Sequence, residues 1–132
     1  MKAIGAMFLV GSLALASLPV ALADQPYVQE YVTEVLEGRN RLECTLQMLG
    51  IQYWSSNANF VLLRVGPTRM HAAKFVEQMR QRGVIIRDRS TDEGCEGCVR
   101  ITLGRSQHVD RLLNALQTVF EQLANLQGVS RP

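Results

Sequence analysis

The chain is poor in lysine and cysteine. Its low net charge argues against one class of protein, and its small, odd number of cysteines argues against another. Lysine occurs only as Lys2 and Lys74 among 132 residues, so arginine supplies almost all of the basic charge. The net charge is +2 and the basic residues are scattered, which excludes an extended nucleic-acid-binding surface. Three cysteines, Cys44, Cys95 and Cys98, are an odd number and a poor disulfide framework. This cysteine usage favours a reducing compartment.

The sequence also lacks several well-known nucleotide-binding and catalytic motifs. It contains no P-loop, no Rossmann glycine pattern and no nucleophile elbow. What it does contain is the composition of a folded domain, with 47% hydrophobic and 20% charged residues. A chain of this length suits one domain with one modest core.

The first 23 residues have two interpretations. Lys2 is followed by an apolar stretch from Ala3 to Ala23, which ends in a small-x-small pattern at Ala21. This arrangement is typical of a secretory signal peptide cleaved after Ala23. It is also typical of a helix that neighbours cover on every side in a larger protein. Pro19 and the many small residues argue against a permanent membrane span.

Hydrophobic periodicity predicts a helix, two strands, a helix, two strands and a helix. The first helix runs from Tyr27 to Leu49, and the other two, capped by Thr68 and Ser106, run to Arg82 and about Leu126. The predicted strands are 51–54, 60–65, 84–87 and 99–103. The order favours an α+β fold in which a small, mostly antiparallel sheet is covered by helices on one face. A ferredoxin-like regulatory domain fits this order poorly.

Two arginines are candidates for binding an anion. Val99 and Ile101 share one face of the last predicted strand, so Arg100 and Thr102 lie on the other, uncovered face. An arginine in such a place is often a solvated surface residue, but its guanidinium also suits bidentate binding of carboxylate or phosphate. Arg87 is a similar candidate, because it ends a strand and leads into a polar loop.

Other chemistry-bearing residues have simpler interpretations. Cys95 and Cys98 have the spacing of a redox motif or of half a zinc site, but a second pair of ligands is absent. They precede a strand rather than opening a helix, so we interpret them as two reduced loop cysteines. Lys74, on an amphipathic helix, is interpreted as solvated, and the lone Trp54 as core filling.

Three segments resemble motifs of histidinol-phosphate aminotransferases. Residues 56–62 (SNANFVL) resemble the family's ANF strand, 83–90 (GVIIRDRS) its GVLVRDRS segment, and 97–104 (GCVRITLG) its GCLRITVG segment. They occur in the family's order, with helices in the expected places. Residues 12–25 are similar to the family's helix that joins the large domain to the small one. The likeness covers roughly residues 12–126.

The resemblance implies the C-terminal small domain of a class-II, fold-type-I aminotransferase that uses pyridoxal 5'-phosphate. Such an enzyme is a cytoplasmic homodimer of histidine biosynthesis, and it transfers an amino group between glutamate or 2-oxoglutarate and histidinol phosphate or imidazole acetol phosphate. Residues 1–26 would be the interdomain-type helix and 27–132 the small domain. By motif match, Arg100 would bind the glutamate α-carboxylate or the substrate phosphate, and Arg87 would help hold the phosphate. Arg105 replaces a threonine of the family motif.

The family's Schiff-base lysine and its other cofactor-binding residues belong upstream of the matching segments. The resemblance therefore implies no catalytic, cofactor-binding or metal-binding residue in this chain, and no activity without a large cofactor-binding domain. We expect neither a nucleic-acid nor a membrane partner, but we expect exposed apolar surface to cause dimerisation or aggregation. The alternative is an exported small α+β binding domain with only an ancestral likeness to aminotransferases.

Overall fold

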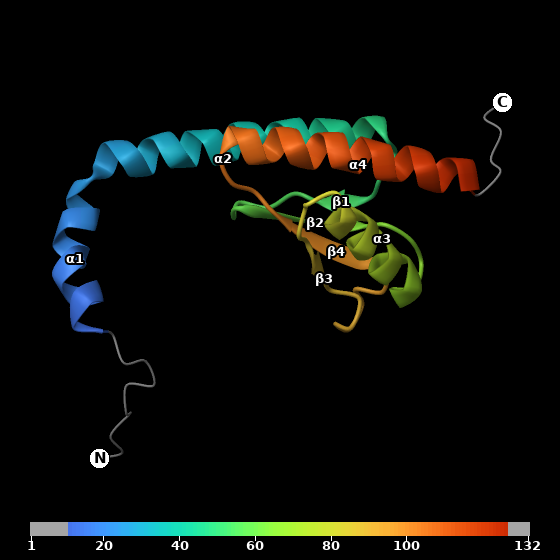
Figure 1. Ribbon diagram of the computed structural model, residues 1–132, viewed down its shortest axis with the longest axis horizontal. Helices are drawn as coiled ribbons and strands as arrows, with labels where there is room; N and C mark the ends of the chain where they lie inside the picture. The colour runs from blue at the N-terminus through green and yellow to red at the C-terminus, as the bar shows by residue number, and fades with distance from the viewer. Residues whose placement is uncertain (1–10, 127–132) are drawn as a thin grey trace, which may run out of the picture. The chain divides into compact units, whose positions relative to one another are not determined.

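The computed structural model describes residues 11–126 and has the predicted α+β fold (Figure 1). Its helices are α1 (Ser12–Ala23), α2 (Gln25–Met48), α3 (Arg69–Gln81) and α4 (Ser106–Leu126). Its strands are β1 (Tyr53–Trp54), β2 (Phe60–Arg64), β3 (Arg87–Asp88) and β4 (Cys98–Thr102). From α2 onward, the order of elements confirms the prediction. The chain divides into two compact units between Val32 and Thr33.

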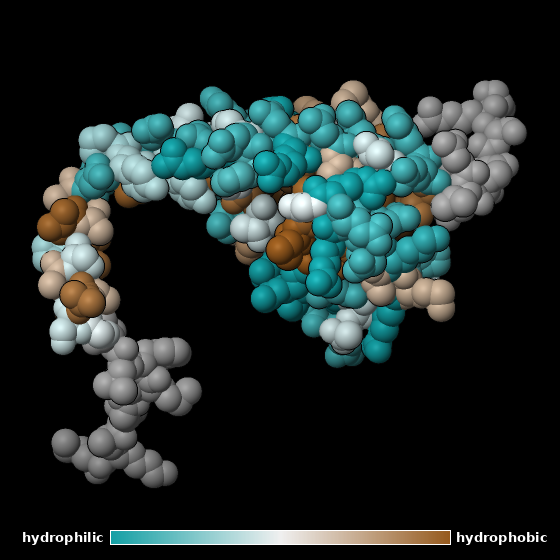
Figure 2. Space-filling model, in the orientation of Figure 1, coloured by the Kyte–Doolittle hydropathy of each residue, from teal (hydrophilic) through white to brown (hydrophobic). Residues whose placement is uncertain are grey.

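The first unit contains α1 and the beginning of α2. The helix α1 is apolar on every side, and none of its residues is buried; Figure 2 shows its apolar side chains at the surface. Asp24 separates the two helices, and its Oδ1 accepts a hydrogen bond from the backbone N of Tyr27 at 3.3 Å. None of the helices within residues 11–126 combines the length and apolar character that crossing a membrane requires. The start of the predicted apolar stretch, residues 3–10, lies outside the described residues.

The second unit is built on a four-stranded sheet in the order β1-β2-β4-β3, with each neighbouring pair antiparallel. The central pair is the longest, and its register runs from Phe60 opposite Thr102 to Arg64 opposite Cys98. Because side chains alternate between the faces of a strand, this register decides which residues of β2 and β4 share a face.

The core lies between one face of this sheet and the helices. Its fully buried side chains come from both central strands and from α2, α3 and α4; they include Val61, Leu63, Val99, Leu42, Leu46, Phe75, Met79, Leu116 and Val119. The rings of Phe75 and Phe120 lie 5.1 Å apart and join α3 to α4. Arg41 of α2 forms an ion pair with Asp110 of α4 at 2.6 Å. The helices therefore cover one sheet face, as predicted.

The edge strands are shorter than predicted because helix ends use part of their backbone. Gly83 adopts φ +75°, and the N–H of Val84 then donates to the carbonyl of Met79. This bond closes the end of α3, so β3 pairs only from Arg87 rather than from Val84. In the same way, Ile51 donates to the carbonyl of Leu46 at the end of α2, and β1 begins later than predicted.

Neither predicted helix cap forms as expected. Thr68 occupies the N-cap position of α3, but its hydroxyl lies 2.7 Å from Nδ1 of His71 and makes no capping hydrogen bond. Ser106 is the first residue of α4 rather than its cap. Its backbone N donates to Oε2 of Glu34, at 2.9 Å, so a carboxylate from α2 stabilises the start of α4.

Candidate functional site

The two predicted arginines lie side by side on the sheet face away from the core. Along β4, Val99 and Ile101 are buried against the helices, whereas Arg100 is half-buried on the opposite face. Arg87 of β3 is the direct cross-strand partner of Arg100. Side chains in this relation have Cβ atoms about 5 Å apart. Sequence reasoning predicted the face, and the strand pairing places the two arginine residues side by side on it.

A shallow hollow of about 370 Å³ lies over this pair. Its lining residues are Ile85, Ile86, Arg87, Asp88, Arg100 and Thr102. Its volume falls within the range of small-molecule sites, and it contains both apolar and cationic groups. Such a lining suits a small ligand that carries a carboxylate or a phosphate.

An aromatic ring supports the guanidinium of Arg100. Its Cζ lies 5.3 Å from the centroid of the Phe60 ring, within the range of a cation–π interaction. The register explains the contact, because Phe60 pairs with Thr102 and so lies diagonally from Arg100 on the same face. The motif SNANFVL contained this phenylalanine, but its contact with Arg100 required the register of β2 against β4.

The guanidinium of Arg100 has unused hydrogen-bonding capacity. Its Nε atom is buried and has no hydrogen-bond partner among the residues described. A buried donor left without an acceptor costs free energy, of the order of 1–3 kcal/mol. A bidentate anion would provide that acceptor and would also use a terminal N–H of the same group.

The electrostatics of the pair also favour an anion. Within residues 11–126, neither Arg87 nor Arg100 forms a salt bridge with a carboxylate. Asp88 lines the hollow, but its Oδ1 already accepts the backbone N–H of Ser90 at 2.8 Å. Two like charges directly opposite each other on adjacent strands repel, and a bound anion would relieve that repulsion.

A second stacked arginine lies on the same face of the sheet. Arg64 is placed over the ring of Trp54, with Cζ 5.6 Å from the centroid, and its Nη2 donates to the carbonyl of Gly94 at 3.3 Å. The interpretation of Trp54 as core filling is therefore wrong, since it lies 39% exposed on a two-residue edge strand. Its apolar ring meets an arginine and solvent instead of the core.

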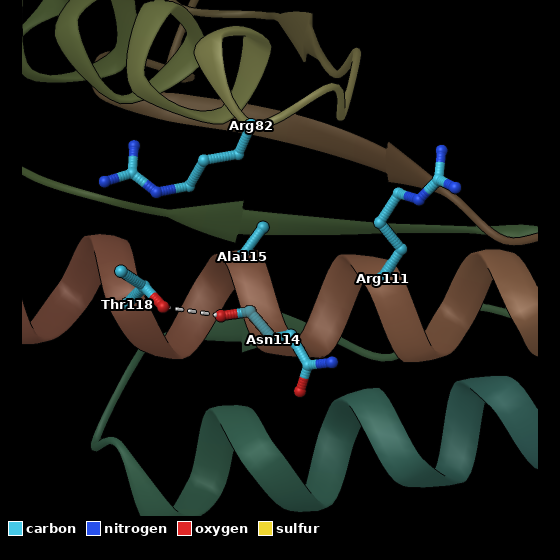
Figure 3. A pocket seen from close by; sticks show the side chains of 5 residues that line it. All are labelled: Arg82, Arg111, Asn114, Ala115 and Thr118. Atoms are coloured by element: carbon cyan, nitrogen blue, oxygen red, sulfur yellow. Dashed lines mark hydrogen bonds between the residues drawn. The ribbon is translucent and has the colours of Figure 1, made fainter.

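A larger hollow between α3 and α4 lacks convergent groups. It has a volume of about 550 Å³ and is lined by Arg82, Arg111, Asn114, Ala115 and Thr118. Figure 3 shows the guanidinium groups of Arg82 and Arg111 pointing to opposite sides. Arg82 also donates to Gln78 and to Gln122, at 2.8 and 2.6 Å. We therefore place the candidate site at Arg87 and Arg100.

The other candidate groups do not assemble with this site. Lys74 is an exposed residue of α3 and does not line the hollow, in agreement with its interpretation as solvated. No cluster of three or more metal-ligating side chains occurs within residues 11–126. Cys95 is a free thiol in the connection between β3 and β4, and Cys98 is a free thiol at the first position of β4.

Comparison with known proteins assigns the chain to a family. The family model for aminotransferase class I and II matches residues 1–116. The histidinol-phosphate aminotransferase of Parabacteroides distasonis is 35% identical over 100 residues, which are 74% of this chain and 28% of that protein. Its counterpart in Nitrosococcus oceani, histidinol-phosphate aminotransferase 1, is 35% identical over 115 residues, which are 87% of this chain and 30% of that protein.

A solved structure agrees with these relatives. Histidinol-phosphate aminotransferase from Sinorhizobium meliloti, in complex with pyridoxal-5'-phosphate, matches with a TM-score of 0.74 and 28% identity. The match covers 85% of this chain and 30% of that one. The chain thus spans less than a third of the length of these relatives. By its sequence and its fold, the chain belongs to the class I and II aminotransferase family.

Proposed function

We propose that this chain is the small domain of a cytoplasmic, pyridoxal phosphate-dependent aminotransferase of histidine biosynthesis. The complete enzyme would transfer an amino group between glutamate or 2-oxoglutarate and histidinol phosphate or imidazole acetol phosphate. The observation that carries the proposal is the pair of arginines, with a buried Nε donor of Arg100 that lacks a partner. These substrates carry carboxylate or phosphate groups, which are the anions that an arginine fork recognises.

The two arginines would have different roles. Arg100 is half-buried and supported by Phe60, so its orientation is set before a ligand arrives. It would bind the glutamate α-carboxylate or the substrate phosphate in bidentate fashion. Arg87 is exposed beside it, at a strand end, and would add a second cation for the phosphate. A preorganised, half-buried donor and an exposed one together suit an anion that must bind and leave.

We infer that a complete pyridoxal phosphate site needs residues beyond those described. The residues that line the Arg87–Arg100 hollow include no lysine, and the described residues contain only one, the exposed Lys74. We therefore propose that the chain acts with a large cofactor-binding domain of the family and a homodimer partner, and that it is inactive by itself. The exposed apolar residues of α1, such as Leu13 and Val20, are consistent with a need for such partners.

A chimera tests this proposal. Residues 12–132 of this chain would replace the aligned stretch of the Nitrosococcus oceani relative, which shares 35% identity with it. We expect the chimera to retain pyridoxal phosphate and to transfer an amino group from glutamate to imidazole acetol phosphate, whereas this chain alone transfers none. The intact relative is the positive control, and amino transfer is followed through 2-oxoglutarate formation.

Two outcomes would contradict the proposal in different ways. A folded chimera that holds the cofactor but transfers no amino group would show that this chain does not bind the proposed substrates. Amino transfer by the purified chain alone would show that the chain does not need a large cofactor-binding domain for activity.

A further inference from the structure

Cys95 and Cys98 lie at the two ends of one tight turn. The backbone N of Cys98 donates to the carbonyl of Cys95 at 2.9 Å, and Gly97, the third residue of the turn, has φ +73°. A turn of this kind brings its end Cα atoms within about 7 Å. A disulfide needs Cα atoms about 4.4–6.8 Å apart, so the backbone already suits one.

The two ends of the turn differ in their surroundings. The Cys98 thiol donates to the backbone carbonyl of Glu96, within the same turn, at 3.9 Å. Cys98 is fully buried and Cys95 is half-buried, so Cys95 is the more accessible residue of the two. Burial, followed by the neighbouring Cys98 and Asp92, raises the pKa of the Cys95 thiol above its ordinary value. Cys98 is thus among the groups that act on the Cys95 thiol, and no set of three metal-ligating side chains occurs within the described residues.

The turn is held in place from the side of β2. Its Gly97 carbonyl accepts the backbone N–H of Val65 at 2.9 Å, and the carbonyl of Gly94 accepts Nη2 of Arg64 at 3.3 Å. The Cα of Gly97 packs so closely on Gly66 that no side chain fits between them. Because both ends of the turn are fixed, disulfide formation requires little movement of the backbone.

We propose that Cys95 and Cys98 form a reversible disulfide, with a low-molecular-weight disulfide such as glutathione disulfide as the oxidant. The Cys95 thiolate attacks one sulfur of the small disulfide and releases the first small thiol. The sulfur of Cys98 then attacks that of Cys95 and releases the second. Each cysteine loses its proton, two electrons pass to the small disulfide, and two small thiols form. This modification is independent of the proposed amino transfer.

The cysteine pair lies close in sequence to the two arginines of the candidate anion site. The turn lies in the connection between β3 and β4, the strands that carry Arg87 and Arg100. Cys98 begins β4, two residues before Arg100. A disulfide would therefore join the start of β4 covalently to the loop that precedes it.

A mass measurement tests the proposal on the full chain. Cys44 is exposed on α2, so the Cys44→Ser variant leaves only the pair. This variant would be incubated with glutathione disulfide at pH 8, alkylated under denaturing conditions and weighed intact. We expect a mass about 2 Da below that of the reduced chain and no alkylation. The product should run as a monomer on a non-reducing gel. After reduction with dithiothreitol, both thiols should again be alkylated.

The matched control is Cys95→Ser in the same background. Because Cys98 is buried, its replacement risks unfolding, whereas Cys95 is half-buried and tolerates serine better. This control should show no 2 Da loss. Two glutathione adducts on the Cys44→Ser chain, disulfide-linked dimers in place of the monomer, or two thiols that stay alkylatable would each overturn the proposal.

Discussion

Replacing Arg100 with lysine in the chimera is expected to lower kcat/KM for glutamate about 100-fold. Lysine keeps the positive charge but loses the planar fork that allows two parallel hydrogen bonds to a carboxylate or phosphate. It also loses the cation–π contact of the guanidinium with the Phe60 ring. A hydrogen bond to a charged group contributes about 1.5–3 kcal/mol, and each 1.4 kcal/mol corresponds to a factor of ten.

The control for this change is Arg111→Lys. Arg111 lines the hollow between α3 and α4, where the guanidinium groups diverge, so its replacement should leave kcat/KM within about twofold. Both variants would be checked for cofactor content and thermal stability, and both would be assayed with glutamate and with histidinol phosphate. Equal kcat/KM values for the two well-folded variants would rule out Arg100 as the anion-binding residue.

The second large effect concerns stability. The variant Gly97→Ala should lower the free energy of unfolding of the chain by about 3–5 kcal/mol. Gly97 adopts φ +73°, where a residue with a Cβ costs about 1–2 kcal/mol. Its added methyl group would also overlap the carbonyl oxygen of Gly66, a backbone atom that cannot rotate away. The measurement is urea unfolding followed by circular dichroism.

Gly94→Ala separates these two causes. Gly94 has nearly the same backbone conformation, φ +75°, but a Cβ there meets no atom within 4 Å. Its replacement should therefore cost only the conformational part, about 1–2 kcal/mol. If both variants lost the same free energy of unfolding, the overlap of the added methyl group with Gly66 would contribute nothing to the loss at Gly97.

Local signals in the sequence accounted for most of the fold. The burial pattern of β4 followed from the alternation of Val99, Arg100 and Ile101, and the end of α3 followed from Gly83. The start of β3 was placed too early, although Val84 after a helix-ending glycine was a usable signal for a closing hydrogen bond. The carboxylate at the start of α4 was not predictable, because Glu34 is distant in sequence and reaches Ser106 only in the folded chain.

The candidate site was predictable only in part, for the same reason. That Arg100 faces away from the core required only the period of a strand. That Arg87 lies directly beside it required the register of β3 against β4, and the stacking on Phe60 required the register of β2. Trp54 was assigned to the core because large aromatic residues are usually buried, yet it lies on an edge strand beneath Arg64.

The central claim is that the hollow over Arg87 and Arg100 binds an anion, and an NMR titration of the chain with inorganic phosphate tests it most directly. The buried Nε–H of Arg100 should give a slowly exchanging ¹H–¹⁵N signal. We predict that phosphate shifts the Arg100 and Arg87 signals along one saturable curve and leaves those of Arg82 and Arg111 unchanged. Saturable shifts at Arg82 and Arg111 alone, or no saturable shift at Arg100, would contradict the claim.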